Sequence, residues 1–117
     1  MRRIRKGLDE NGRYGMEIQE KVGERTLTLA FSGEMDHHGA RDTLRRMELA
    51  IDAALPKTLT LDFGGVTFMD SSGIALILRS QRRMSLLDGN MILRNVPPQA
   101  RRVLEAAGIH RLVTLQA

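Results

Sequence analysis

The stretch FGGVTFMDSSGIALI, residues 63–77, decides the fold of this chain. Its first part has the apolar residues typical of the end of a strand, and its last part, IALI, those of a helix. The polar run DSSG, residues 70–73, lies between these two parts. Backbone N–H groups at a helix start have no acceptor inside the helix, and the helix dipole is positive there. The stretch therefore predicts either a plain helix cap or a site for a reactive hydroxyl group.

Length and composition indicate one ordinary domain. A chain of 117 residues buries enough surface to fold without covalent cross-links. The absence of cysteine excludes disulfides and thiolate metal sites, and it suits a reducing compartment. The apolar runs are far shorter than the ~18 residues of a membrane span, and the basic start is not followed by an apolar segment. We therefore expect a cytoplasmic protein with neither a membrane segment nor a secretory signal.

The net charge of +4 is unevenly distributed. Residues 14–78 are acidic, with six lysines and arginines against ten acids, and the segments on either side are basic. A nucleic-acid-binding protein would use these basic flanks as phosphate contacts. Base stacking needs exposed aromatic rings, however, and Phe31, Phe63 and Phe68 all occupy strand patterns predicted to be buried. We expect no direct nucleic-acid binding, and we interpret most of the arginines as solvated helix faces.

Hydrophobic periodicity predicts a hairpin followed by alternating helices and strands. Pro56 ends the first helix, because proline cannot continue the hydrogen-bond ladder and forces Leu55 out of helical geometry. Pro97 and Pro98 open the third helix, and Gly108 is a candidate to end it. The expected elements are a loose arm at 1–14, a short edge strand at 16–22, strands at 26–32, 58–63, 91–94 and 112–115, and helices at 40–54, 72–87 and 98–107.

The order β-β-α-β-α-β-α-β predicts an α/β fold with a mixed, mostly parallel sheet. Strands joined by helices are parallel, because right-handed crossovers return the chain to the same end of the sheet. The loops at 33–38, 70–73 and 95–97 should therefore meet at the carboxyl edge, where α/β sheets build their sites. Asp36 and Ser71 are expected to be neighbours in space.

Two motifs occur together at this spacing: GEMDHH at residues 33–38 and MDSSG at residues 69–73, with the strand LTLDF at 59–63 and an apolar helix after the second motif. In this combination the chain resembles the STAS domain. More narrowly, it resembles the bacterial anti-sigma factor antagonists of the sporulation type, which act on the anti-sigma-F factor. The resemblance implies a STAS domain over residues 15–117, preceded by a flexible basic arm at 1–14. The family usually has a further helix after the last strand, and we expect it to be shortened or missing here.

The resemblance implies a protein switch without catalytic activity or a cofactor. In that family the first serine of the DSSG motif, here Ser71, accepts a phosphoryl group. The partner is an anti-sigma factor that is also an ATP-dependent serine kinase: it releases its sigma factor when the unphosphorylated antagonist binds, and a serine phosphatase reverses the phosphorylation. The expected partner-binding residues are Gly33, Glu34, Asp36, His37, Asp70, Ser71, Ser72 and Gly73.

Several of these residues also have simpler structural interpretations. Ser72 is either an alternative phosphoacceptor or a residue of the cap or first helical turn. Gly73 allows either close approach of a partner backbone or tight packing of the helix. Asp36 can cap the first helix, contact the partner, or do both.

Two enzyme interpretations are disfavoured. His37 and His38 point in different directions and lack a third ligand nearby in sequence, so we expect no metal site. A hydrolase built from Ser71, His37 and Asp36 lacks the nucleophile-elbow pattern, and adjacent residues do not readily form the orienting Asp–His bond. The main alternative function is a STAS adaptor subunit of a transporter or stress-signalling complex, in which Ser71 is never phosphorylated.

Overall fold

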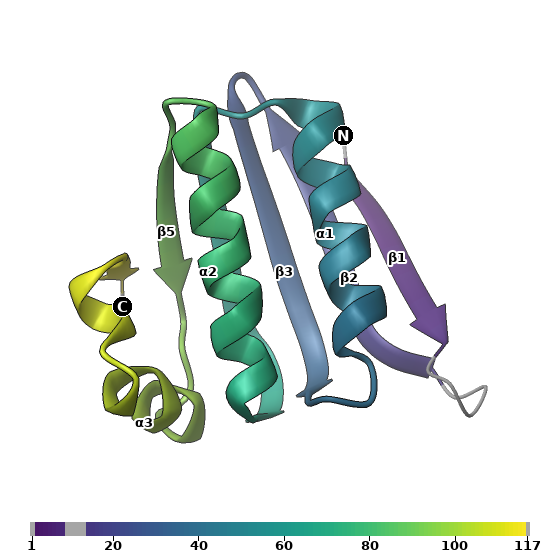
Figure 1. Ribbon diagram of the computed structural model, residues 1–117. Helices are drawn as coiled ribbons and strands as arrows, with labels where there is room; N and C mark the ends of the chain where they lie inside the picture. The colour runs from purple at the N-terminus through teal and green to yellow at the C-terminus, as the bar shows by residue number, and fades with distance from the viewer. Residues whose placement is uncertain (1, 9–13, 117) are drawn as a thin grey trace.

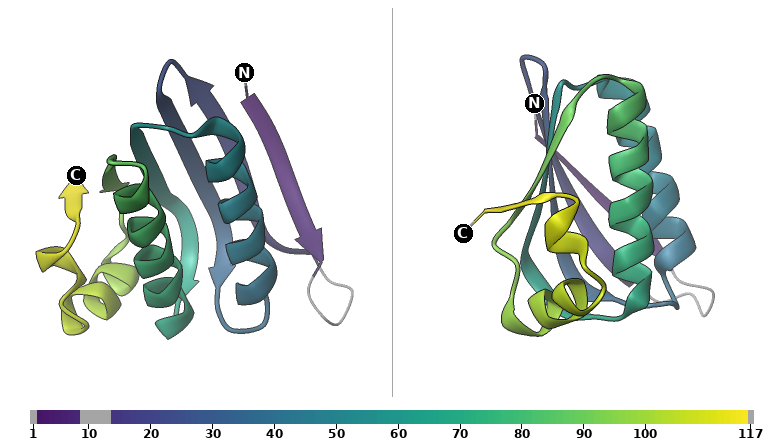
Figure 2. Two further views of the ribbon diagram at one scale, coloured as in Figure 1. Left: turned by 45° about the horizontal axis from the view of Figure 1, so that its top comes forward. Right: turned by 60° about the vertical axis from the view of Figure 1, so that its left-hand side comes forward.

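The structure is a computed structural model that describes residues 2–8 and 14–116. A sheet with the strand order β1-β2-β3-β4-β5-β6 carries helices α1 and α2 side by side on one face (Figure 1). Figure 2 shows the two helices forming a layer of their own beside the sheet, with α3 near one end of it. The elements are β1 Arg2–Leu8, β2 Tyr14–Gly23, β3 Thr26–Met35, α1 Ala40–Ala54, β4 Thr58–Met69, α2 Ser71–Leu86, β5 Asn90–Arg94, α3 Pro98–Ala106, the short 3₁₀ helix η1 Ile109–Arg111 and β6 Thr114–Gln116.

Strand directions confirm the predicted mixed sheet. The strands β1, β2 and β3 pair antiparallel, as hairpin-linked strands do. The pairs β3–β4, β4–β5 and β5–β6 are parallel, because a helix or helical segment connects the two strands of each pair. The carboxyl ends of β3, β4 and β5 therefore lie at one edge of the sheet.

The N-terminal segment differs from the prediction, which placed residues 1–14 outside the sheet. Residues 2–8 form β1, so β2 lies inside the sheet and is not the expected edge strand. The register sets Arg3 opposite Glu20 and Lys6 opposite Glu17, but it also sets Arg2 opposite Lys21. The basic run has no apolar alternation, so periodicity could not identify it as a strand. Residues 1 and 9–13 of the predicted arm lie outside the described residues, and for them flexibility stays a prediction.

The core lies between the sheet and the two helices. Alternate residues of the central strands point into it, and the rings of Phe31 and Phe63 lie 5.5 Å apart at its centre. The helices contribute the periodic apolar faces expected from the sequence, except that Leu78 of α2 is 40% exposed. Fully buried members of this core include Leu27, Leu29, Phe31, Met47, Ile51, Leu59, Leu61, Phe63, Met69 and Ile77.

Strand β4 is longer than predicted, because two irregularities let it continue past Phe63. Its register with β3 shifts between Ala30 and Ser32 and again between Gly33 and Glu34. Glycine is required at position 65, since a Cβ there would lie 2.9 Å from the carbonyl oxygen of Phe31. The shifts change which residues face the core at the end of the strand.

The two helices are joined by a network of ion pairs. The guanidinium of Arg83 donates two parallel hydrogen bonds to Asp52, at 2.8 and 2.7 Å, and also pairs with Glu48. Arg79 lies 3.2 Å from the same Glu48. Hydrogen bonding to Asp52, assisted by the charge of Glu48, raises the pKa of Arg83. Arg79 is exposed, as the sequence predicted, whereas Arg83 is half-buried, and both arginines link α2 to α1.

The first and third helices end close to the residues that the sequence predicted would end them. Leu55 adopts φ 45° immediately before Pro56, and Gly108 adopts φ 76° after α3, a left-handed conformation that favours glycine. The last strand begins at Thr114 and not at residue 112, and Leu112 is 55% exposed. None of the helices in residues 2–8 and 14–116 combines the length and the hydropathy that a membrane crossing requires.

Replacing Arg83 with alanine should lower the free energy of unfolding by about 1 kcal/mol, because a bidentate pair and its network are lost. Arg83→Lys should lose less, since it keeps the charge without the planar fork. Urea unfolding at low and at 1 M salt measures both effects, and screening should shrink them at high salt. The matched control is Arg82→Ala at the exposed neighbouring position. An equal loss in this control would show that the ion pairs do not matter.

Candidate functional site

The ends of β3 and β4 and the start of α3 meet at the carboxyl edge of the sheet. Met35 and Met69 are paired in register, and the N–H of Asp70 donates to the carbonyl oxygen of Met35 at 3.1 Å. From α3, the side-chain amide of Gln99 bonds both the N–H and the carbonyl of Met69, at 2.9 and 2.8 Å. The predicted gathering of the three loops is therefore present, and Gln99 is a part of it that sequence reasoning missed.

Asp70 holds the two motifs together. One carboxylate oxygen accepts the N–H of Ser72 at 2.7 Å, which caps α2, and the other accepts the N–H of His37 at 3.1 Å. The cap is thus Asp70 and neither of the serines. Partial burial raises the pKa of the Asp70 carboxyl, but hydrogen bonds from Ser72 and His37 outweigh that effect and hold this pKa below its usual value. Asp70 is therefore a fixed negative charge at the start of α2.

The two serines differ in access. Ser71 is the first residue of α2 and is exposed, whereas Ser72 is half-buried and occupies the first turn, which is one of the roles expected for it. A phosphoryl group added to Ser71 would stand at the positive end of the helix dipole, beside the carboxylate of Asp70. Of the two hydroxyl groups, that of Ser71 is the more open to a modifying enzyme.

Gly73 serves packing inside the molecule. It is buried in α2, and a Cβ at this position would lie 2.6 Å from both Cγ and Sδ of Met69, which is itself fully buried. The structure therefore favours the tight-packing interpretation of Gly73 over close approach of a partner.

The motif at residues 33–38 forms the other side of the site. Gly33 adopts φ 108° within β3, and Glu34 beyond it is exposed. Asp36 does not cap α1 as the sequence suggested: its carboxylate accepts the N–H of His38 at 3.0 Å, and the cap residue of α1 is Gly39, which makes no side-chain cap bond. Asp36 lies three residues before the cap position, too far from the first turn of α1 to cap it, and its side chain closes a local turn instead.

The histidines lie at the surface of this site. Both are exposed, their ring centres are 4.1 Å apart, and Nδ1 of His37 lies 3.5 Å from the Asp70 carboxylate. His37 thus pairs with Asp70 and not with the adjacent Asp36 that a catalytic triad would need. Within the described part of the chain, no group of three potential metal ligands is found.

Phe68 is a further surface residue that the sequence analysis misplaced. It was predicted to be buried, yet it is 44% exposed, and the register sets it opposite Glu34. The shift between Gly33 and Glu34 breaks the alternation, so Met69 faces the core and Phe68 faces outward. Phe68 therefore places an exposed aromatic ring near the carboxyl end of β4, three residues before Ser71.

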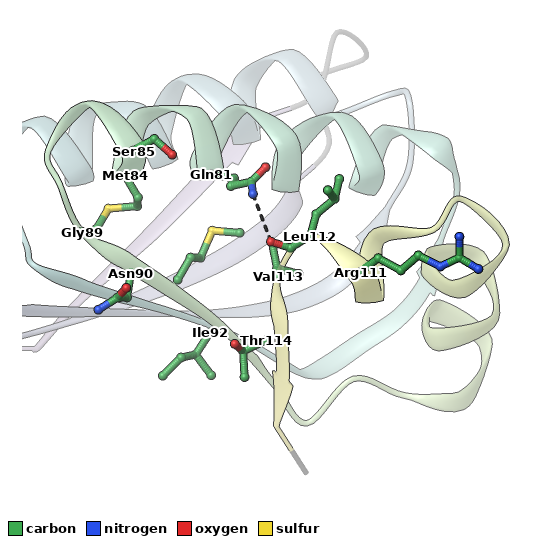
Figure 3. Close-up of a pocket in the computed structure, with 11 residues that line it drawn as sticks. Gln81, Met84, Ser85, Gly89, Asn90, Ile92, Arg111, Leu112, Val113 and Thr114 are labelled. Carbon is green, nitrogen blue, oxygen red and sulfur yellow. Dashed lines mark hydrogen bonds between the residues drawn. The ribbon is translucent and has the colours of Figure 1, made fainter.

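A hollow of about 600 Å³ lies away from these motifs, between the second half of α2, the start of β5 and the segment before β6 (Figure 3). Its wall includes Met84, Ser85, Asn90 and Leu112, and Gln81 donates a hydrogen bond to the Leu112 carbonyl at 3.1 Å across it. None of the site residues expected from the sequence lines this hollow.

Comparison with known protein families finds that the STAS domain model matches residues 16–117. Among curated proteins, the chain is similar to the anti-sigma F factor antagonist of Lysinibacillus sphaericus, with 32% identity over 90 residues and 77% of each chain covered.

Solved structures agree with this match. The unphosphorylated form of the anti-sigma factor antagonist SpoIIAA is similar with a TM-score of 0.73 and 29% identity, covering 86% of this chain and 88% of that one. The phosphorylated form of the Bacillus cell fate determinant SpoIIAA is similar with a TM-score of 0.65 and 29% identity, covering 86% and 91%. The predicted fold class is thereby confirmed.

Asp70→Asn should lower the free energy of unfolding by about 1–2 kcal/mol at pH 7, because an amide has one acceptor oxygen and therefore loses one of the two backbone hydrogen bonds together with the charge at the helix start. Since folding depresses the pKa of Asp70, its contribution is present above the unfolded value of about 3.9 and is lost as pH falls through the folded value. Urea unfolding between pH 3 and 7 should show the two proteins converging in acid. Glu24→Gln, in the exposed turn between β2 and β3, is the control. A gap that stays constant in acid would contradict the assignment.

Gly73→Ala should destabilise the fold by about 1–2 kcal/mol, since overpacking against Met69 exceeds the gain in helix propensity. Met69→Ala removes the atoms that the new methyl group meets. Unfolding of the two single variants and the double variant should therefore give a favourable coupling of at least about 0.5 kcal/mol. Strictly additive losses would show that the two positions do not collide.

Proposed function

The chain belongs to the STAS domain family, among the anti-sigma factor antagonists, and on this premise we propose that it is an anti-anti-sigma factor. It binds an anti-sigma factor in the cytoplasm and thereby frees a sigma factor, without catalytic activity of its own. The observation that carries the proposal is the exposed Ser71 at the first position of α2, beside the fixed carboxylate of Asp70.

Phosphorylation of Ser71 turns this protein off. The anti-sigma factor acts as the kinase: the Ser71 oxygen forms a bond to the γ-phosphorus of ATP, the bond from that phosphorus to the bridging oxygen breaks, and ADP leaves. The hydroxyl proton passes to a base of the kinase. A serine phosphatase hydrolyses the phosphate ester and resets the switch. The exposure of Ser71 supports this proposal, as does the existence of phosphorylated and unphosphorylated forms of the similar SpoIIAA.

The partner surface comprises both motifs. Asp70 ties them together, so the anti-sigma factor that reaches Ser71 also covers the neighbouring loop after β3. Phe68 adds an aromatic contact at the same edge. The proposed contact residues are Gly33, Glu34, Asp36, His37, Phe68, Asp70, Ser71 and Ser72, with the buried Gly73 setting the position of α2 beneath them.

Charge explains the loss of binding. A phosphoryl group brings about −1.5 to −2 charges beside Asp70. In the free protein water screens this repulsion, but a partner pressed on the site expels the water. At ~5 Å and an effective dielectric constant near 20, each pair of unit charges costs about 3 kcal/mol. A penalty of about 3–4 kcal/mol lowers affinity roughly 200- to 1000-fold.

The same change should leave the fold intact. The phosphate lies in solvent at a helix start, where the dipole favours a negative charge. The Asp70 cap remains available to the N–H of Ser72. The switch therefore acts through the surface and does not require unfolding.

The test is to incubate the protein with the anti-sigma factor kinase of its own organism and ATP, and to locate the phosphate by peptide mass spectrometry. One phosphate on Ser71 is expected, absent from Ser71→Ala and retained in Ser72→Ala. Ser71→Ala should bind the kinase constitutively, and Ser71→Asp should bind at least tenfold more weakly, both with unchanged circular dichroism. No phosphate, with the kinase active on another antagonist, would favour an adaptor role over this proposal.

A further inference from the structure

A small apolar cavity opens between the first turns of α1 and α2. Its volume is about 100 Å³. Thr43 and Ser72 are among its lining residues, but the wall is almost entirely apolar, and Met35 is a buried, flexible side chain that can adapt its shape. Ala75 is exposed, so the cavity reaches the surface. The lining residues are Met35, Ala40, Thr43, Leu44, Ser72 and Ala75 with Leu76.

The position of the cavity is fixed relative to Ser71. Ser72 is the next residue, and Ala75 lies one turn further on, about 6 Å along the helix, on the same exposed face. A stable protein interface covers about 800 Å² of each partner. An interface of that size centred on Ser71 extends over this cavity, whose lining begins at the next residue.

We propose that the anti-sigma factor inserts one aliphatic side chain, that of a leucine, isoleucine or methionine, into the cavity between α1 and α2. This inference rests on the proposed function and adds the anchor by which the partner is held. The volume suits one branched aliphatic group, and the largely apolar wall offers little to a charged one. Buried apolar anchors at the centre of an interface supply most of its affinity.

The anchor also strengthens the effect of phosphorylation. An aliphatic side chain enters the cavity only if water leaves its mouth. A phosphoryl group on Ser71, one residue from the wall, holds a hydration shell at that mouth. Phosphorylation therefore opposes anchor insertion in addition to repelling Asp70, and the two effects act on the same bound state.

The experiment fills the cavity from either wall. Ala75→Leu from α2 and Ala40→Leu from α1 should each weaken binding to the unphosphorylated protein by about 10- to 100-fold, since the anchor side chain no longer fits. Calorimetric titration with the anti-sigma factor of the same organism measures the dissociation constant. Ala53→Leu is the matched control, because it makes the same substitution at an exposed position near the far end of α1.

A second variant separates cavity volume from surface disturbance. Leu44→Ala removes from the α1 wall as many side-chain atoms as Ala75→Leu adds to the α2 wall. The double variant should therefore recover binding to within about threefold of the wild type. A surface clash outside the cavity would not be relieved by a change at Leu44.

The outcomes distinguish the two proposals. Wild-type protein that binds, with both filled variants binding as tightly as Ala53→Leu, overturns the anchor and leaves the proposed function standing. Loss of binding without recovery in the double variant also overturns the anchor. Wild-type protein that fails to bind its anti-sigma factor overturns the proposed function and the anchor with it. If Ala75→Leu proves unfolded by circular dichroism, Ala40→Leu decides the matter.

Discussion

The structure of the site depends on one carboxylate that serves two loops. Asp70 accepts the N–H of Ser72 in its own helix and the N–H of His37 from the loop after β3. The first bond satisfies an otherwise unpaired donor at a helix start. The second joins segments 33 residues apart in sequence. Without this bridge, the two motifs would be neighbours by topology but free to move relative to one another.

The edge of the sheet makes that bridge possible. Parallel pairing of β3 with β4 brings Met35 opposite Met69, and the side-chain amide of Gln99 hydrogen-bonds both the N–H and the carbonyl of Met69. Gly73 then allows α2 to lie close against the same methionine. Each contact restrains the point where β4 becomes α2. The exposed Ser71 is thus held at a restrained position at the start of α2.

The sequence was sufficient for the order of the elements from β2 onward and for the meeting of the loops, because both follow from periodicity and from the handedness of crossovers. It was insufficient where the side that a residue faces depends on one extra residue in a strand, and where a contact depends on side-chain geometry. The register shift at Gly33 turns Phe68 outward, which alternation cannot reveal. The cap could not be assigned to Asp70 among three adjacent polar residues, nor Gln99 to Met69, since both choices depend on side-chain geometry in three dimensions. The strand β1 escaped notice because its basic sequence has no apolar alternation.

In the proposed switch, the inner and outer faces of α2 have different roles. Gly73 faces inward and packs against the core, so a substitution there changes the free energy of unfolding. Ser71 faces outward, so a charge added to it stays in water and would change the contact with the proposed partner. Asp70 acts on both faces: its hydrogen bonds stabilise the start of α2, and under the proposed function its charge repels an added phosphate once a partner expels the water. The proposed switch therefore changes binding without unfolding the protein, because the carboxylate that repels the phosphate also caps the helix.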